Sequence, residues 1–115
     1  MTPSMNADQI IAHLDLAPHP EGGHYRQTWV ATNPGRPSGT CIYFLLRTGE
    51  RSHWHRVDAT EIWLYHAGAP QIIVPENHWQ AARSTGEFTL VSCTVSPGFT
   101  FDGFTLAPPE INIPR

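Results

Sequence analysis

The chain has 115 residues, enough for one hydrophobic core but not for two, so we expect a single domain spanning residues 1–115. Its formal net charge is −3 and its basic residues are not clustered, which argues against a nucleic-acid partner. The first six residues lack the features of a secretory signal, and no apolar run approaches the roughly 18 residues that span a membrane. We therefore expect a cytoplasmic protein.

Proline and glycine are abundant relative to charged residues, with eleven prolines, nine glycines and a charged fraction of 15%. This composition predicts an all-β fold of short strands joined by tight turns, not a helical bundle. Cys41 and Cys93 lie far apart in apolar strand patterns, and neither has a Cys-x-x-Cys context. We interpret them as two buried thiols, with a disulfide as the alternative.

One short helix is expected near the amino terminus, from about Ala7 to Leu14. Asn6 can cap its first turn, with Gln9 at the reciprocal position of a capping box. Apolar residues at spacings of three and four give the helix one packing face, and a proline stops it. We expect packing, and no chemistry, from this helix.

A tight turn and a strand follow the helix. The paired glycines after Pro-Glu suit the turn, and residues 24–30 then read as a strand. Alternation places three side chains on one face, Tyr25, Gln27 and Trp29, and three on the other, His24, Arg26 and Thr28. The second face either meets water or lines a polar pocket.

Two later segments also read as strands. Residues 40–46 are nearly all apolar, which is typical of a strand covered on both faces. Residues 88–95 alternate between apolar and polar, as a half-buried strand does. The aromatic, turn-rich stretch at 97–104 is expected to fold back as a lid over the edge of the barrel.

The chemistry concentrates around two histidines and a glutamate. His53 and His55 are two residues apart, so on a regular strand both imidazoles point to the same face. Glu61 opens the next apolar run after a short turn, which brings a carboxylate beside them. Two imidazoles and a carboxylate suit a divalent Zn, Fe, Mn or Ni ion. The alternative is a pair of surface histidines.

This block resembles the first cupin motif, G-x5-HxH-x3,4-E-x6-G, whose positions are matched in order by Gly49, His53, His55, Glu61 and Gly68. Gly49 is closer to His53 than the motif has it, and Glu61 is one residue further from His55. The second cupin motif begins at Pro75. There Asn77 stands at the glycine position, and Gln80 stands where the last metal-binding histidine belongs.

Further blocks narrow the resemblance: HPEGGHYR (19–26), IYFLL (42–46), HR (55–56), EIW (61–63), WQAA (79–82) and CTVSPGF (93–99). Together they look like a small, single-domain cupin family of uncharacterised function that is similar to dTDP-sugar epimerase cupins. The likeness covers about residues 10–108. It implies a double-stranded β-helix, a jelly-roll-like barrel, commonly a homodimer, with its site inside.

One departure concerns the middle of the chain. The family pattern has roughly two more strands between the positions of Gly68 and Pro75, where this chain has only residues 69–74. Either the barrel is open on one side, or a neighbouring subunit closes it, or the short segment is an artefact of the expressed sequence. Since an open barrel leaves strand edges unpaired, we expect a homodimer.

Carried over residue by residue, the resemblance implies a list of metal ligands, namely His53, His55, Glu61 and Gln80. Glutamine is a neutral and weaker ligand than histidine. His78 shares a strand face with Gln80 and could replace it if the register shifts. The alternative is a metal-free pocket in which the same residues hydrogen-bond a small ligand.

Other residues are candidates for binding and catalysis. Arg26 and Arg56 could hold an anionic group, because guanidinium groups fit phosphates and carboxylates. An aromatic wall suited to a sugar or another flat ring would be made of Tyr25, Tyr43, Trp63 and Tyr65. The proton-transfer candidates are His24, Tyr25 and His66. The alternative for Arg56 is a surface position, and the alternative for each aromatic residue is a place in the core. No motif chooses between His24 and His66.

Three functions fit these features. The first is a metal-assisted or acid/base isomerase or epimerase acting on a small polar molecule, such as a carbohydrate derivative. The second is an Fe(II) dioxygenase, because two histidines and one carboxylate also describe that site. The third is a non-catalytic cupin that binds a small ligand, which the glutamine at 80 and the short middle of the chain favour.

Overall fold

The structure, a computed structural model, describes residues 5–66, 72–84 and 87–111. The one α-helix among these residues is α1 (Ala7–Leu14). The Asn6 side chain accepts a hydrogen bond from the Gln9 backbone, and the Gln9 side chain accepts one from the Asn6 backbone. The predicted capping box is therefore confirmed. No helix in the described part of the chain is long and apolar enough to cross a membrane.

Strands make up most of the rest of the fold. In chain order they are β1 (Ala17–Pro18), β2 (His24–Val30), β3 (Thr40–Arg47), β4 (Arg51–Val57), β5 (Thr60–Tyr65), β6 (Ile72–Val74), β7 (Gln80–Arg83), β8 (Phe88–Ser96) and β9 (Phe104–Leu106). A 3-10 helix, η1 (Phe101–Gly103), stands between β8 and β9. The predicted strands at 24–30, 40–46 and 88–95 are confirmed.

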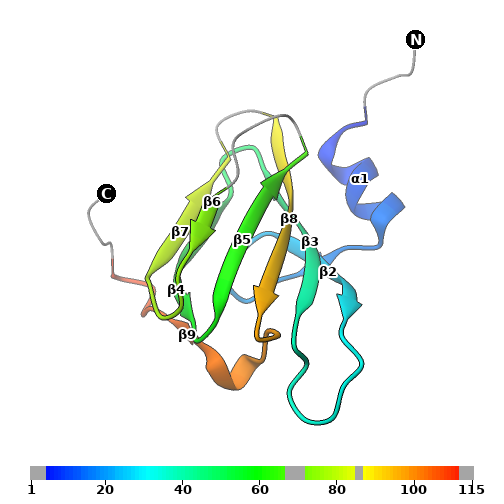
Figure 1. Ribbon diagram of the computed structural model, residues 1–115. Coiled ribbons are helices and arrows are strands. Elements are labelled where there is room, and N and C mark those ends of the chain that lie inside the picture. The colour runs from blue at the N-terminus through cyan, green and yellow to red at the C-terminus, as the bar shows by residue number, and fades with distance from the viewer. Residues whose placement is uncertain (1–4, 67–71, 85–86, 112–115) are drawn as a thin grey trace.

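The strands form two sheets that face each other (Figure 1). One sheet has the order β1-β2-β3-β8-β5-β6, and the other has the order β7-β4-β9. All of the pairings are antiparallel, as in a jelly roll. The predicted all-β cupin architecture with a short amino-terminal helix is confirmed, although the two sheets do not join into a closed barrel within the described residues. Gly68 and its neighbours from 67 to 71 lie outside the described residues.

The core lies between the sheets because alternate side chains of the larger sheet point inward. Its buried centre is formed by Phe44, Leu46, Trp63, Val91 and Cys93. On the other face of β3, Leu45 is fully buried. Both cysteines are free thiols, as expected, with Cys93 buried and Cys41 half-buried.

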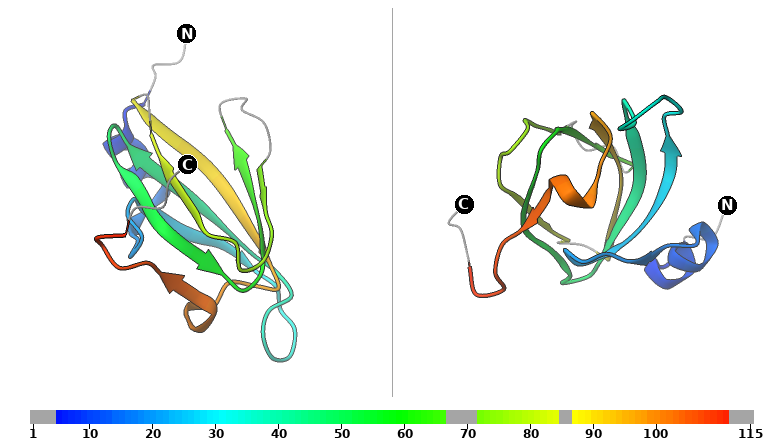
Figure 2. Two further views of the ribbon diagram at one scale, coloured as in Figure 1. Left: turned by 90° about the vertical axis from the view of Figure 1, so that its left-hand side faces the viewer. Right: turned by 90° about the horizontal axis from the view of Figure 1, so that it is seen from below.

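The chain after β8 folds back across the space between the two sheets, as the right-hand view of Figure 2 shows. Residue Thr100 caps η1 with its side chain, and β9 then pairs with β4. Phe99 packs its ring edge-to-face against Phe101, with centroids 5.0 Å apart. The predicted fold-back of residues 97–104 is therefore observed, and it brings aromatic rings over one opening.

Candidate functional site

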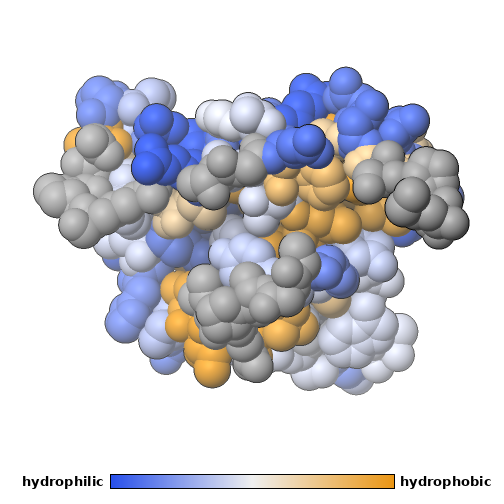
Figure 3. All heavy atoms as spheres, turned by 90° about the horizontal axis from the view of Figure 1, so that it is seen from above, coloured by the Kyte–Doolittle hydropathy of each residue, from blue (hydrophilic) through white to orange (hydrophobic). Residues whose placement is uncertain are grey.

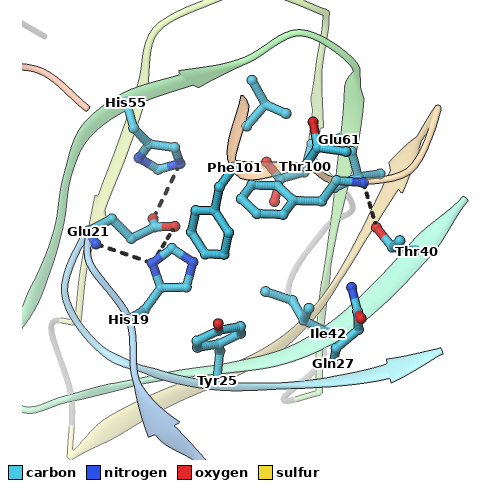
Figure 4. Close-up of a pocket in the computed structure, with 13 residues that line it drawn as sticks. His19, Glu21, Tyr25, Gln27, Thr40, Ile42, His55, Glu61, Thr100 and Phe101 are labelled. Carbon is cyan, nitrogen blue, oxygen red and sulfur yellow. Dashed lines mark hydrogen bonds and ion pairs between the residues drawn. The ribbon is translucent and has the colours of Figure 1, made fainter. Parts of the chain in front are cut away.

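A cavity of about 270 Å³ lies between the sheets and under the folded-back segment (Figure 4). Its charged and titratable lining residues are His19, Glu21, His55 and Glu61. The rest of its lining is formed by Tyr25, Gln27, Thr40, Ile42, Val57, Val95, Phe99, Thr100 and Phe101. The cavity thus combines two carboxyl groups and two imidazoles with aromatic and aliphatic walls.

A glycine turn before β2 delivers His19 and Glu21 to the cavity. His19 and Gly23 are joined by a backbone hydrogen bond of 2.9 Å, and Gly22 bonds back to His19 at 3.0 Å. Gly22 and Gly23 both have positive φ, 109° and 78°, which side chains disfavour. A Cβ on Gly23 would also lie 2.8 Å from the Leu45 carbonyl oxygen. The Gly-Gly pair therefore allows this turn to pack directly on β3.

The Glu21 carboxyl group lies between two imidazoles. Its Oε1 is 3.2 Å from His19 Nδ1, and its Oε2 is 3.2 Å from His55 Nε2. The Ser52 hydroxyl donates to Oε2. The side chains of Glu21, His19 and His55 are each at most 9% exposed. Figure 4 shows them gathered at one side of the cavity, with Glu61 on the opposite side.

Hydrogen bonds to the backbone fix which nitrogen of each imidazole carries a proton. His55 Nδ1 is 2.7 Å from the His53 carbonyl oxygen, so it must donate, and Nε2 of the neutral ring is left as an acceptor. The Glu21 backbone N–H donates to His19 Nδ1 at 3.1 Å, so that nitrogen is also an acceptor. Both imidazoles therefore present lone pairs to the carboxyl group of Glu21. At least one proton must therefore be shared between Glu21 and these two imidazoles.

Burial decides which group holds that proton. Burial, with a smaller contribution from Glu61, raises the pKa of Glu21 from 4.5 to about 8, although the Ser52 hydrogen bond opposes the shift. Burial also lowers the pKa of His55 and brings that of His19 to about 4. At neutral pH the proton therefore lies on the Glu21 carboxyl group, and both imidazoles are neutral.

The expectation that His53 and His55 share one face is wrong. In the pairing of β4 with β7, Ser52 lies opposite Ala82 and His55 lies opposite Gln80, so β4 contains one extra residue. This bulge puts Ser52 and His55 on the inner face. His53 instead lines a separate surface pocket, and its Nε2 lies 2.9 Å from the Pro108 carbonyl oxygen.

Glu61 is held by a chain of hydrogen bonds from the core. Trp63 Nε1 donates to Gln80 Oε1 at 3.0 Å, and Gln80 Nε2 donates to Glu61 Oε1 at 2.9 Å. Burial raises the pKa of Glu61, while the bonds from Gln80 and the Cys93 thiol oppose the shift. The indole thus fixes the orientation of the amide, which in turn fixes the carboxyl group.

The predicted ligands do not fit a metal ion, as their positions and contacts show. His53 lines a separate pocket, and His55 and Glu61 lie on opposite sides of the cavity (Figure 4). The Gln80 carbonyl oxygen accepts the Trp63 N–H. Within residues 5–66, 72–84 and 87–111, no three His, Cys, Asp or Glu side chains are grouped to hold a metal. His78 is exposed and does not line the cavity.

The other predicted site residues divide between the cavity and the rest of the fold. Tyr25 lines the cavity and packs edge-to-face on His19, with centroids 4.5 Å apart. Trp63 and Tyr65 pack in the core and do not line the cavity. Tyr43 contacts His66, whose Nε2 lies 2.8 Å from Ser92 Oγ, and neither lines the cavity.

The predicted arginines also lie elsewhere. Arg26 is exposed on the opposite face of β2 from Tyr25. Arg56 is exposed and lies 5.0 Å from the centroid of the Trp79 ring. His24 is half-buried, and its Nδ1 has no hydrogen-bond partner among the described residues. None of these three lines the cavity, since alternation along the strands turns them outward.

Two functional candidates, His19 and Glu21, were missed from the sequence. They stand in the HPEGGHYR block, which looked like a turn and supported the family resemblance only. Glu21 meets Ser52 and His55 across more than 30 residues of chain, so no local pattern indicates the contact. The one available signal was a histidine and a glutamate placed just before a glycine pair.

Comparison with protein families gives a match to the Cupin superfamily (DUF985) in two segments, residues 8–72 and 69–107. The chain belongs to this family. The two segments meet where the sequence is short relative to the family pattern. A search of curated proteins found no match.

Several solved structures are similar to this cupin. A protein from Shewanella oneidensis has 38% identity and a TM-score of 0.82, over 90% of this chain and 85% of that chain. A hypothetical protein from Leishmania major has 27% identity and a TM-score of 0.80, over 90% and 88%. A DMSP lyase from Ruegeria pomeroyi has 16% identity and a TM-score of 0.61, over 97% and 73%, which is a likeness of fold alone.

Proposed function

We propose that this cupin is an acid/base enzyme that moves a proton on a small polar molecule, in the manner of an isomerase or epimerase. The observation that supports it is the arrangement of Glu21 Oε2 and His55 Nε2, which lie 3.2 Å apart in the cavity. A carboxyl group whose pKa is about 8 can both give and take a proton near neutral pH. The likeness to dTDP-sugar epimerase cupins stays a prediction.

In this proposal the two groups act in turn. Neutral His55 takes a proton from one position of the bound molecule through Nε2, and Glu21 gives its own proton to another position. The enzyme is then left with an imidazolium beside a carboxylate. Transfer of the proton from His55 to Glu21 restores the starting state, so the net reaction moves one proton within the substrate.

Neighbouring groups support these steps. The His53 carbonyl oxygen holds the Nδ1 proton of His55 and stabilises the imidazolium form. The Ser52 hydroxyl, which donates to Glu21 Oε2, stabilises the carboxylate form. Tyr25 is a further proton donor, because it lines the cavity and contacts His19. The other sequence-predicted candidates, His24 and His66, take no part.

No step of this reaction passes through a metal ion. The Zn, Fe, Mn or Ni site expected from the sequence and the Fe(II) dioxygenase alternative both depend on ligands that the fold holds apart. Elemental analysis of the purified protein tests this point. Stoichiometric metal that is lost in a folded His53→Ala variant would restore the predicted metal site.

Deuterium incorporation tests the proton transfer even while the substrate is unidentified. The purified protein is incubated in D2O with an extract of small metabolites, and mass spectrometry is used to find molecules that gain deuterium. We expect labelling by the wild type and by Glu76→Gln, whose glutamate is exposed. Glu21→Gln should label roughly 100-fold more slowly or worse. Equal labelling by Glu21→Gln would overturn the proposal.

A ligand-binding cupin without turnover is the second candidate. It is favoured by Gln80, whose amide is committed to holding Glu61 and not to a metal. Native mass spectrometry distinguishes the two functions. A small molecule that is retained after purification, without deuterium incorporation into any metabolite, would replace the enzyme by a binding protein.

We also propose a homodimer. Among the described residues, β1 and β6 are the outer strands of the larger sheet, and Ile73 on β6 is 59% exposed. Exposed strand edges normally need cover. Seen from above, the surface carries hydrophobic patches between hydrophilic areas (Figure 3). Sedimentation equilibrium at micromolar concentration should give twice the mass of the chain, and a monomer would overturn this proposal.

A further inference from the structure

The cavity contains acidic groups, but no lysine or arginine side chain lines it. Two carboxyl groups line it, those of Glu21 and Glu61, and both are at least 90% buried. The sequence has no lysine, and every arginine except Arg115 lies in the described part of the chain. None of those arginines lines the cavity. A phosphate or carboxylate ligand would therefore meet two acidic groups and no counter-charge.

Most of the arginines are engaged or exposed elsewhere. Arg36 donates to both oxygens of Asp58, at 3.0 and 2.7 Å. Arg47 lies 2.9 Å from Asp8. Arg56 lies over Trp79, on the outside of the smaller sheet. The cavity's two imidazoles are neutral at pH 7, because burial lowers the pKa of both. A positive charge in the cavity must therefore come from the ligand.

Aromatic rings form the other part of the lining. Tyr25 closes one side, and Phe99 and Phe101 come from the segment that folds back over the opening. Phe101 is 54% exposed, which places it at the mouth (Figure 4). The face of an aromatic ring attracts cations, most strongly where water is excluded. The rings and the carboxyl groups are separate features of the cavity, and both favour a ligand with a positive charge.

The volume of the cavity limits the size of its ligand. At about 270 Å³ it lies just below the usual range for ligand pockets, roughly 300–1,000 Å³. It is therefore suited to a small molecule and not to a nucleotide-linked sugar. Three polar side chains in the lining, Gln27, Thr40 and Thr100, can bind a hydroxyl or carbonyl group of such a molecule.

We infer that the cavity binds a small organic cation, a protonated amine or a quaternary ammonium group, between Glu61 and the aromatic rings. The inference rests on the proposed function in taking this cavity as the reaction site, and it adds the charge of the substrate. The cation supplies the counter-charge that lets a buried carboxyl group ionise. It also places the uncharged part of the molecule beside Glu21 and His55.

Three probes of nearly equal shape test the charge preference: choline, its neutral isostere 3,3-dimethylbutan-1-ol, and the anion 3,3-dimethylbutanoate. Their dissociation constants for the full chain are measured by isothermal titration calorimetry at pH 7. We expect choline to bind at least about tenfold more tightly than the alcohol. The anion should bind more weakly than both. Equal binding of choline and the alcohol, or preferred binding of the anion, would overturn the inference.

Two variants assign the preference to this cavity. Glu61→Gln should bring choline to about the affinity of the alcohol, whereas Glu76→Gln, outside the cavity, should keep the wild-type ratio. Circular dichroism checks that each variant is folded. If Glu61→Gln does not fold, Phe101→Leu replaces it, because Phe101 is exposed. Phe101→Leu should weaken choline several-fold and the alcohol less. If a folded cavity variant kept the wild-type ratio of choline to alcohol affinity, the cation would bind elsewhere and its assignment to this cavity would be overturned.

Proton release gives a second measurement on the wild type. Burial raises the pKa of Glu61, so a cation that favours the ionised form of this carboxyl group should release protons. Titration in two buffers of different ionisation enthalpy should detect release with choline and none with the alcohol. No release with choline would count against the inference. Deuterium labelling that persists despite this result would show that only the substrate charge was wrong.

Discussion

The cavity has two buried carboxyl groups, and their surroundings differ in kind. Glu21 is surrounded by groups that can exchange or donate a proton, namely His19, His55 and the Ser52 hydroxyl. Glu61 is held by the Gln80 amide, which does not titrate and is itself fixed by an indole N–H, and by the Cys93 thiol, whose pKa burial raises. Equal burial therefore supports two different roles.

This difference separates proton transfer from charge placement. A carboxyl group beside acceptor nitrogens can pass its proton along a short path, so changes near Glu21 should affect reaction rate. A carboxyl group held by fixed donors keeps its position in either protonation state, so changes near Glu61 should affect binding and stability. Variants on the two sides of the cavity test whether this division holds.

The largest effect is expected from His55→Gln. The glutamine side chain can still hydrogen-bond but cannot accept a proton at neutral pH, so deuterium labelling should slow by about 100- to 10,000-fold. On the other side of the cavity, Gln80→Ala should lower the labelling rate by less than tenfold at saturating substrate. Similar losses of labelling rate in the two variants would contradict the assignment of proton transfer to the side of Glu21 alone.

The next largest effect is a loss of folding stability when the hydrogen bonds that hold Glu61 are broken. Trp63→Phe removes the indole N–H and leaves the Gln80 carbonyl oxygen buried without its donor. We expect a loss of about 1–3 kcal/mol in the free energy of unfolding, measured in urea. Trp79→Phe is the matched control, because Trp79 is 39% exposed, and it should change stability by less than about 1 kcal/mol. Equal losses would remove the role assigned to the indole.

The general architecture was predictable because it follows from local pattern. Alternation in residues 88–95, the apolar run at 40–46 and the capping box at Asn6 each depend on neighbours within a few residues. Of the predicted site, His55, Glu61 and Tyr25 do line the cavity. Tyr25 and Glu61 lie where the side chains of their strands alternate regularly, whereas His55 lies at the bulge in β4.

The rest of the site depends on features that local pattern does not contain. The bulge in β4 is set by its pairing with β7, a strand about 30 residues later, and it turns His53 outward. The orientation of the Gln80 amide depends on Trp63, which spacing alone places in an aromatic wall. Glu21 reaches the cavity only because the Gly-Gly turn packs on β3. Arg26 and Arg56 were predicted to bind an anion because local pattern does not show that their side chains face away from the cavity.

A pH titration of stability tests the raised pKa of Glu21. In the unfolded chain this group ionises near pH 4.5, but in the folded protein it keeps its proton up to about pH 8. Its contribution to stability is therefore complete below pH 4.5 and is lost as the pH rises to 8. His19 acts in the opposite direction, but only below about pH 6.5, because its folded pKa is about 4.

The informative window is thus pH 7 to 8, where His19 is largely neutral in both states. Over it the wild type should lose about 1 kcal/mol of unfolding free energy through Glu21. Glu21→Gln should reduce this slope, and urea unfolding at four pH values measures it. An unchanged slope in the variant would mean that Glu21 ionises normally in the fold.

The smallest effect is expected from Arg26→Ala, next to Tyr25 but on the opposite face of β2. Arg26 is exposed and does not line the cavity, so the free energy of unfolding should change by less than about 0.5 kcal/mol. Choline affinity should stay within twofold of the wild type. Tyr25→Phe, one residue away, removes a hydroxyl group from the cavity wall and should change choline affinity more.

If Arg26→Ala instead weakened binding of the anion 3,3-dimethylbutanoate, the arginine would act on the ligand. The anion site expected from the sequence would then displace the cation site inferred from the cavity.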